Sequence, residues 1–197
     1  MAEKGYKILV IGESRAGKTS LIMRYTNDSF LDTVSTIGVD IKVKKITINN
    51  NEYLFKIWDT AGQEKFYSLG SNFFKGVHGI IVAFDLAESS ALSKLNGWIS
   101  KVKENIDSTV PIVIVGTKCD LKNIKIKPES INVVASLHKS KYFETSSKNN
   151  INVTDAFTSL ENEIIIQNSD DQEQMRQFIL EHSDNIKKGE EKKCCKN

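Results

Sequence analysis

The chain has 197 residues, a formal net charge of +2 and a hydrophobic fraction of 40%. That is enough for one domain with a buried core and a shorter tail, and a near-balanced charge without a basic stripe argues against nucleic-acid binding. No apolar run reaches the roughly 18 residues of a membrane span. Residues 1–7 lack the apolar centre of an export signal, and the three cysteines, two of them adjacent, form no disulfide framework, so we expect a cytosolic protein.

The first motif is a phosphate-binding loop. The apolar run 7–11 reads as a strand and leads into Gly-Glu-Ser-Arg-Ala-Gly-Lys-Thr at 12–19, which fits G-x-x-x-x-G-K-[ST]. In such a loop the backbone N–H groups surround a polyphosphate, Lys18 reaches the β and γ phosphates, and the Thr19 hydroxyl ligates Mg²⁺. The helix that starts near Gly17 adds the positive end of its dipole. We expect nucleotide contacts from Glu13, Ser14, Arg15, Ala16, Gly17, Lys18, Thr19 and Ser20.

A second motif follows the apolar run 54–58, which reads as a buried strand and ends in Asp-Thr-Ala-Gly-Gln at 59–63. The Asp59 carboxylate can hold the metal from the far side. Gly62 can bring its backbone N–H close to a γ-phosphate, and Gln63 is placed to orient an attacking water. This segment therefore predicts the hydrolytic side of the site.

Two further strand ends predict recognition of guanine. The run 110–115 leads into Thr117, Lys118 and Asp120, and the Asp120 carboxylate can accept hydrogen bonds from the N1–H and 2-amino groups of guanine. After a third run, 142–144, the turn containing Ser146, Ser147 and Lys148 offers amides to the guanine O6 atom. Adenine matches neither pattern, so we expect GTP and GDP as ligands.

The elements alternate between strands and helices, which predicts an α/β fold. We expect a P-loop NTPase three-layer sandwich: a mostly parallel six-stranded sheet with one antiparallel edge strand and helices on both faces. The antiparallel strand comes from a hairpin of 41–48 against 53–58, turned by three asparagines at 49–51. All four motifs then lie at the carboxyl ends of strands, where ligands bind in such sheets.

Three helices are predicted from apolar stripes at helical spacing. Pro128 fits the first turn of one of them. The stripes expected in the core are Leu92, Leu95, Trp98, Ile99, Val102 and Ile106 in the first helix and Val153, Phe157, Leu160 and Ile164 in the third; the second helix carries Ile131, Val134 and Leu137. Cys119 is expected to be a small buried filler.

The four motifs in series resemble the Ras superfamily of small GTPases, and within it the Rab family. The Rab-like segments are Ser-Thr-Ile-Gly-Val-Asp at 35–40, together with 58–66, 73–76 and 78–82, in a resemblance that covers 5–167. It implies that Thr36 binds Mg²⁺ and the γ-phosphate in the GTP state and acts with Lys18 and Gln63 in hydrolysis. It also implies that Phe30 stacks on guanine and that Asp59 holds Mg²⁺ through water.

The resemblance further implies a monomeric switch that cycles between the cytosol and the cytosolic face of intracellular membranes and regulates vesicle traffic. The implied partners are an exchange factor, a GTPase-activating protein that supplies an arginine, a prenylation escort, a dissociation inhibitor and GTP-state effectors. The effectors are expected to contact Ile41, Trp58 and Phe73, which occupy the positions of a Rab surface triad.

The chain departs from the family pattern at several positions. The segment 31–35 before Thr36 is shorter than usual, Thr117 replaces the commoner Asn, and Ile41 stands where an aromatic residue is usual. Arg15 replaces a small residue; its cation either attracts phosphate or points into solvent, and we favour solvent. Arg15 and the shortened segment before Thr36 keep open an alternative, a GTP-binding module with little hydrolysis. A P-loop kinase fits less well, because no basic lid or acceptor pocket is recognisable.

We place the domain boundary at Gln167, with 168–197 as a flexible tail. The alternative for its apolar patch at Met175, Phe178, Ile179 and Leu180 is a short amphipathic helix or a docking element. Lysines flank Cys194 and Cys195, which resemble the doubly geranylgeranylated end of Rab proteins, and two lipid chains anchor stably where one is marginal. The rival reading is an unmodified basic tail.

Overall fold

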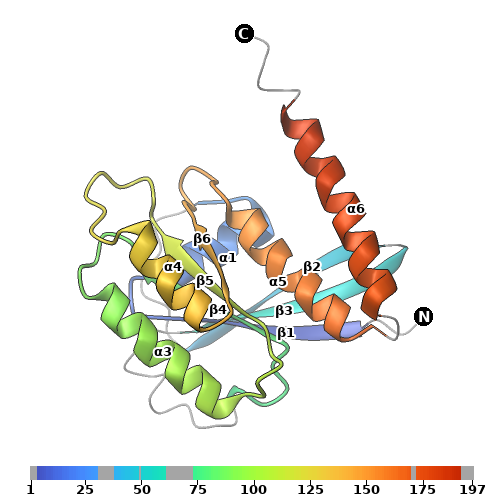
Figure 1. Cartoon of the computed structure of the whole chain (residues 1–197), viewed down its shortest axis with the longest axis horizontal. Coiled ribbons are helices and arrows are strands. Elements are labelled where there is room, and N and C mark those ends of the chain that lie inside the picture. The colour runs from blue at the N-terminus through green and yellow to red at the C-terminus, as the bar shows by residue number, and fades with distance from the viewer. Residues whose placement is uncertain (1–3, 31–37, 49, 61–72, 170–171, 192–197) are drawn as a thin grey trace.

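A six-stranded sheet forms the centre of the protein, with its strands in the order β2-β3-β1-β4-β5-β6 (Figure 1). This computed structural model describes residues 4–30, 38–48, 50–60, 73–169 and 172–191. The strands are β1 (Lys4–Ile11), β2 (Val39–Ile48), β3 (Asn51–Thr60), β4 (Gly79–Asp85), β5 (Ile112–Thr117) and β6 (Lys141–Glu144). Neighbours pair in parallel except β2, which is an edge strand antiparallel to β3, so the predicted mixed sheet is confirmed.

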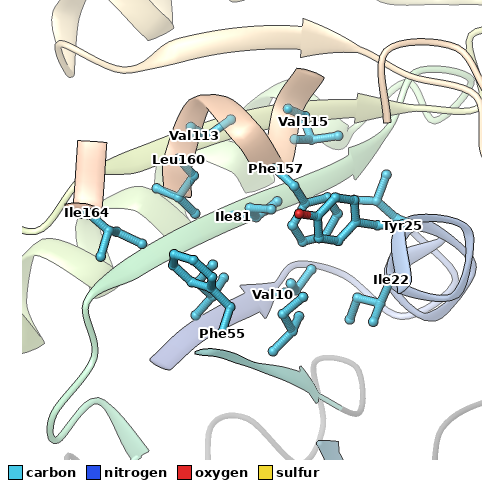
Figure 2. Close-up of a cluster of buried hydrophobic side chains, with 14 of the residues drawn as sticks. Val10, Ile22, Tyr25, Phe55, Ile81, Val113, Val115, Phe157, Leu160 and Ile164 are labelled. Atoms are coloured by element: carbon cyan, nitrogen blue, oxygen red, sulfur yellow. The ribbon is translucent and has the colours of Figure 1, made fainter. Parts of the chain in front are cut away.

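Helices cover both faces of this sheet, which confirms the three-layer α/β sandwich. Helices α1 (Lys18–Asn27) and α5 (Val153–Gln167) contribute to one buried apolar cluster, and α3 (Ala91–Asn105) and α4 (Pro128–Leu137) contribute to the other. Figure 2 shows part of the first cluster, where the rings of Tyr25 and Phe157 stack with centroids 4.1 Å apart. Leu160 and Ile164 continue the same apolar face of α5.

The burial of the strands follows their place in the sheet. All six residues of β5 are buried, and in β4 only the last residue, Asp85, is partly exposed, because helices cover these central strands on both faces. The edge strand β2 instead alternates between exposed and partly buried residues from Ile41 onward. At its turn, Asn50 has a φ of 56°, a left-handed conformation that asparagine tolerates well.

Details of α4, β5 and Cys119 complete the comparison with the predicted elements. Leu137, one of the apolar residues carried by the predicted second helix, is 74% exposed. Each residue turns an α-helix by about 100°, so Leu137 lies roughly 120° around the axis of α4 from Ile131. Val134 and Ala135 lie at smaller angles from Ile131 and are buried. Strand β5 starts at Ile112 rather than Val110, because Val110 is in a turn with Asp107 and Pro111 follows it. Cys119 is only partly buried, so the prediction of a buried filler is wrong.

A further helix, α6 (Gln172–Glu191), follows α5 and packs beside it, and its far end points away from the sheet (Figure 1). Met175 packs against the first apolar cluster, and Ile179 is buried. The chain therefore adopts the helical alternative in this part of the expected tail, because Met175, Phe178 and Ile179 recur at the spacing of one helix face. Among the described residues, no helix is both long enough and apolar enough to cross a membrane.

The first cluster contains one carboxyl group, that of Glu161 on α5, which is 1% exposed. The Tyr25 hydroxyl lies 2.7 and 2.8 Å from its two oxygens and can donate to either. Burial raises the pKa of Glu161 to about 7, despite the opposing effects of the Tyr25 hydrogen bond and of Lys44. Lys44 itself extends from β2 over the Tyr25 ring, 5.1 Å from the centroid.

Glu161 predicts a pH-dependent stability. Because its pKa is about 7 in the folded chain and 4.5 without burial, stability is highest below about pH 4.5, falls as pH rises toward 7 and levels off above it, by about 3 kcal/mol in total. Urea unfolding between pH 4.5 and 8 should show this fall in the wild type and not in Glu161→Gln. The matched control is Glu163→Gln, two residues further along α5 and paired with Lys141; equal pH slopes in all three proteins would contradict the assignment.

Candidate functional site

The loop between β1 and α1 is shaped by close approach to β4. Gly12 has a φ of 140°, and a Cβ atom there would lie 1.9 Å from the Ala83 carbonyl oxygen, so only glycine fits. Arg15 and Gly17 also have positive φ, of 63° and 80°, and α1 begins directly after Gly17. Ser14 and Arg15 are exposed while Ala16 is buried, in keeping with the preference for Arg15 in solvent. Ser20 follows in the first turn of α1 and is partly buried.

Lys18 is held inside this loop. Its side chain is 5% exposed, and Nζ donates hydrogen bonds to the carbonyl oxygens of Gly12 at 3.0 Å and Glu13 at 2.8 Å. The loop thus fixes an ammonium group at a helix N-terminus, two features that both favour a phosphate ligand.

Two side chains with oxygen atoms that can ligate a metal, Thr19 and Asp59, are in contact next to this loop. The Thr19 hydroxyl donates to the Asp59 Oδ2 atom at 2.7 Å, which joins the start of α1 to the end of β3. Asp59 is 2% exposed. A hydroxyl and a buried carboxylate at this distance are oxygen ligands of the kind that Mg²⁺ prefers, so these residues fit the expected metal.

The two base-recognition segments lie next to each other. The Ser146 hydroxyl donates to the Asp120 Oδ1 atom at 2.6 Å, and the backbone N–H of Cys119 donates to the Thr145 carbonyl at 3.0 Å. Ser147 is buried and Lys148 is exposed in the same turn. The structure therefore brings the Asp120 carboxylate and the amides of the turn to one end of the sheet.

Thr117 and Lys118 connect this base-recognition end to the phosphate loop. The buried Thr117 hydroxyl lies 2.7 Å from the Ala16 carbonyl and 3.0 Å from the Phe84 carbonyl, and it can donate to either. Lys118 Nζ donates to the Arg15 carbonyl at 2.9 Å and pairs with Asp85 at 2.7 Å. Threonine thus replaces the usual asparagine and still ties the two loops together.

Sequence reasoning missed several residues of this network. Arg24 on α1 donates from Nε to the Ser147 carbonyl at 2.7 Å, which anchors the base-recognition turn. Asp85 pairs with Lys118, and Glu13 is held by Trp98 and Lys94 of α3. These partners are far apart along the chain, and no motif marks them.

Several predicted site residues lie outside the described part of the chain: Thr36, Gly62, Gln63, Cys194 and Cys195. Phe30 is described, 38% exposed, just beyond the left-handed Asp28 that ends α1. This exposure leaves part of the ring accessible for stacking.

The predicted surface triad is contiguous. Ile41 on β2 is the cross-strand partner of Trp58 on β3, and the Trp58 and Phe73 rings meet edge-on with centroids 5.7 Å apart. Ile41 is 44% exposed. Lys7 lies beneath the pair, with Nζ 4.3 Å from the Trp58 ring centroid and 2.7 Å from the Phe73 carbonyl.

Comparison with known proteins agrees with this geometry. The model of the Ras family matches residues 7–166. The chain is 36% identical to Ras-related protein Rab-13 of Rattus norvegicus over 82% of this chain and 80% of that protein. It is 35% identical to GTP-binding protein YPT1 of Saccharomyces cerevisiae, with 81% and 78% covered, and 36% identical to Ras-related protein RABD2c of Arabidopsis thaliana, with 79% and 78% covered.

The fold and the site thus define a P-loop GTPase, and the chain belongs to the Ras family. Within that family it is a Rab-like small GTPase, which binds GTP and GDP and hydrolyses GTP.

Thr117→Val should accelerate nucleotide release. Valine keeps the shape of threonine but removes the hydroxyl that ties the base-recognition segment to Ala16, and one lost hydrogen bond corresponds to roughly a five- to tenfold faster rate. Stopped-flow dissociation of fluorescent GDP measures this rate. The exposed Thr109 provides the control variant Thr109→Val; a Thr117→Val rate equal to that of the control would contradict the role of the hydroxyl.

Proposed function

We propose that this Rab-like GTPase is a GTP/GDP switch in vesicle traffic that recognises guanine through Asp120 and the turn at 145–148. The observation that carries the proposal is the hydrogen bond from Ser146 to Asp120, supported by the tie from Thr117 to the phosphate loop. These contacts hold a carboxylate and a set of backbone amides close together, and such a pair matches the N1–H, 2-amino group and O6 of guanine. Phe30 completes this end by stacking on the base.

At the other end, the backbone of 13–17, Lys18 and Ser20 binds the phosphates. Thr19 and Asp59 are the described residues that would hold Mg²⁺, and Thr36 joins them in the GTP state. When bound, Mg²⁺ would neutralise charge on the β and γ phosphates. Lys18 stabilises the charge that develops during hydrolysis, because its ammonium is already fixed by two carbonyl groups and needs little reorganisation.

Hydrolysis by this site is expected to be slow without a partner. Gly62 approaches the γ-phosphate with its N–H group, and Gln63 orients the attacking water. Arg15 is exposed in the described structure, so we assign the arginine that accelerates the reaction to a GTPase-activating protein. Loss of the γ-phosphate then releases Thr36 and the segment around Gln63, which is the switching event.

Gln63→Leu should retain GTP. Leucine cannot orient water by hydrogen bonding, so partner-stimulated hydrolysis should fall at least about a thousandfold, as expected for loss of a group that acts in the transition state. Single-turnover hydrolysis of preloaded GTP with and without a GTPase-activating protein measures the effect. Undiminished stimulated hydrolysis would remove Gln63 from the mechanism.

Effectors of the GTP state are proposed to bind the triad of Ile41, Trp58 and Phe73. Support comes from its continuity on one side of the β2–β3 hairpin and from two further exposed apolar residues of β2, Val39 and Val43. Aromatic residues in such a patch are common anchors of protein interfaces. Exchange factors, a prenylation escort and a dissociation inhibitor complete the proposed set of partners.

Attachment to the cytosolic face of an intracellular membrane is proposed to need Cys194 and Cys195. Two prenyl chains give stable anchoring, and each nearby lysine adds about 1 kcal/mol at an anionic leaflet. The change of both cysteines to serine should move the protein from the membrane fraction to the cytosolic fraction of cells, while fluorescent GDP binding stays unchanged. An unaltered membrane fraction would exclude lipidation at these residues.

A further inference from the structure

The side chain of Glu13 leaves the phosphate loop and binds helix α3. The Trp98 indole Nε1–H donates to its Oε1 atom at 3.0 Å, and Lys94 Nζ lies 3.5 Å from its Oε2 atom. Trp98 is 7% exposed, and a buried indole N–H needs an acceptor. The carboxylate of the loop supplies that acceptor across 85 positions of sequence.

The backbone of the same residue holds Lys18. The Glu13 carbonyl accepts the 2.8 Å hydrogen bond from Lys18 Nζ and a weaker one, at 3.3 Å, from the Ala16 N–H. Glu13 is therefore the point where α3 is connected to the lysine that reaches the phosphates. A displacement of its side chain would move the carbonyl that fixes this ammonium.

The negative charge of Glu13 gives its contacts with α3 a second role. A carboxylate next to a polyphosphate site repels the ligand unless it is directed away or paired. Here Trp98 holds it toward α3, and Lys94, with a side chain 40% exposed, compensates part of its charge. Without these two contacts the Glu13 side chain would no longer anchor the loop to α3, and its carboxylate would be free to approach the phosphates.

We infer that Glu13 is a positioning residue for the bound nucleotide and that Trp98 acts through it to slow nucleotide release, so that α3 is coupled to exchange. The inference rests on the proposed role of the loop in binding the phosphates. It adds to that role a specific link from the phosphate loop to α3.

The test is the dissociation of fluorescent GDP from the full chain in Mg²⁺. Trp98→Phe keeps an aromatic ring but removes the N–H donor, and we expect release at least about tenfold faster, as for one lost hydrogen bond to a charged group. Glu13→Ala, which removes both the anchor and the charge, should show a smaller increase. Glu13→Gln keeps an acceptor oxygen and should release GDP no faster than the wild type.

The double variant Glu13→Ala with Trp98→Phe separates positioning from general structural damage. If Trp98 acts through Glu13, the double variant releases GDP at the rate of Glu13→Ala alone. If Trp98 merely packs, Trp98→Phe accelerates release by the same factor in both backgrounds, and the inference is overturned. Glu13→Ala and Glu13→Gln releasing GDP at the same rate would overturn it as well.

Lys94 gives a weaker second test with a matched control. Lys94→Ala should accelerate release by at most about threefold, because exposed ion pairs are weak, and the effect should vanish at high salt. Lys103→Ala, on the same helix but in contact with His138, should leave release unchanged. Wild-type protein that fails to retain GDP would refute the proposed function itself, whereas retention with unaltered Trp98→Phe release would refute the inference alone.

Discussion

The close approach of Gly12 to Ala83 is the constraint on which the site depends. It brings the loop after β1 against β4, so the carbonyls of Gly12 and Glu13 can fix the Lys18 ammonium. The same turn brings the Ala16 carbonyl to the Thr117 hydroxyl. Any side chain at position 12 would displace the loop from the sheet and separate these contacts.

The sequence predicted the sheet, the layers and the four strand-end segments because each carries a local signal. Gly12 to Thr19 has fixed spacing, and the stripe of α5 repeats at helical period. The links between segments had no such signal. Arg24 and Ser147 are 123 positions apart, and only the folded chain shows that they meet.

Tertiary packing decides which apolar residues of a helix are buried when their local patterns are similar. Leu137 fits an apolar stripe but lies on the solvent side of the last turn of α4. Met175 and Ile179 were predicted in a polar tail, yet their spacing lets α6 cover part of the core beside α5. In both helices the angular position of a residue around the helix axis, rather than the composition of the segment, determines whether it is buried.

A guanine-selective site that hydrolyses its ligand slowly is tested by loading the purified chain with GTP and, in parallel, with ATP in the presence of Mg²⁺. The bound nucleotide is then followed by chromatography. We expect selective retention of GTP and its slow conversion to GDP. Equal retention of ATP would contradict the role of Asp120, and GTP that persists unhydrolysed would contradict the switch and favour a binding module.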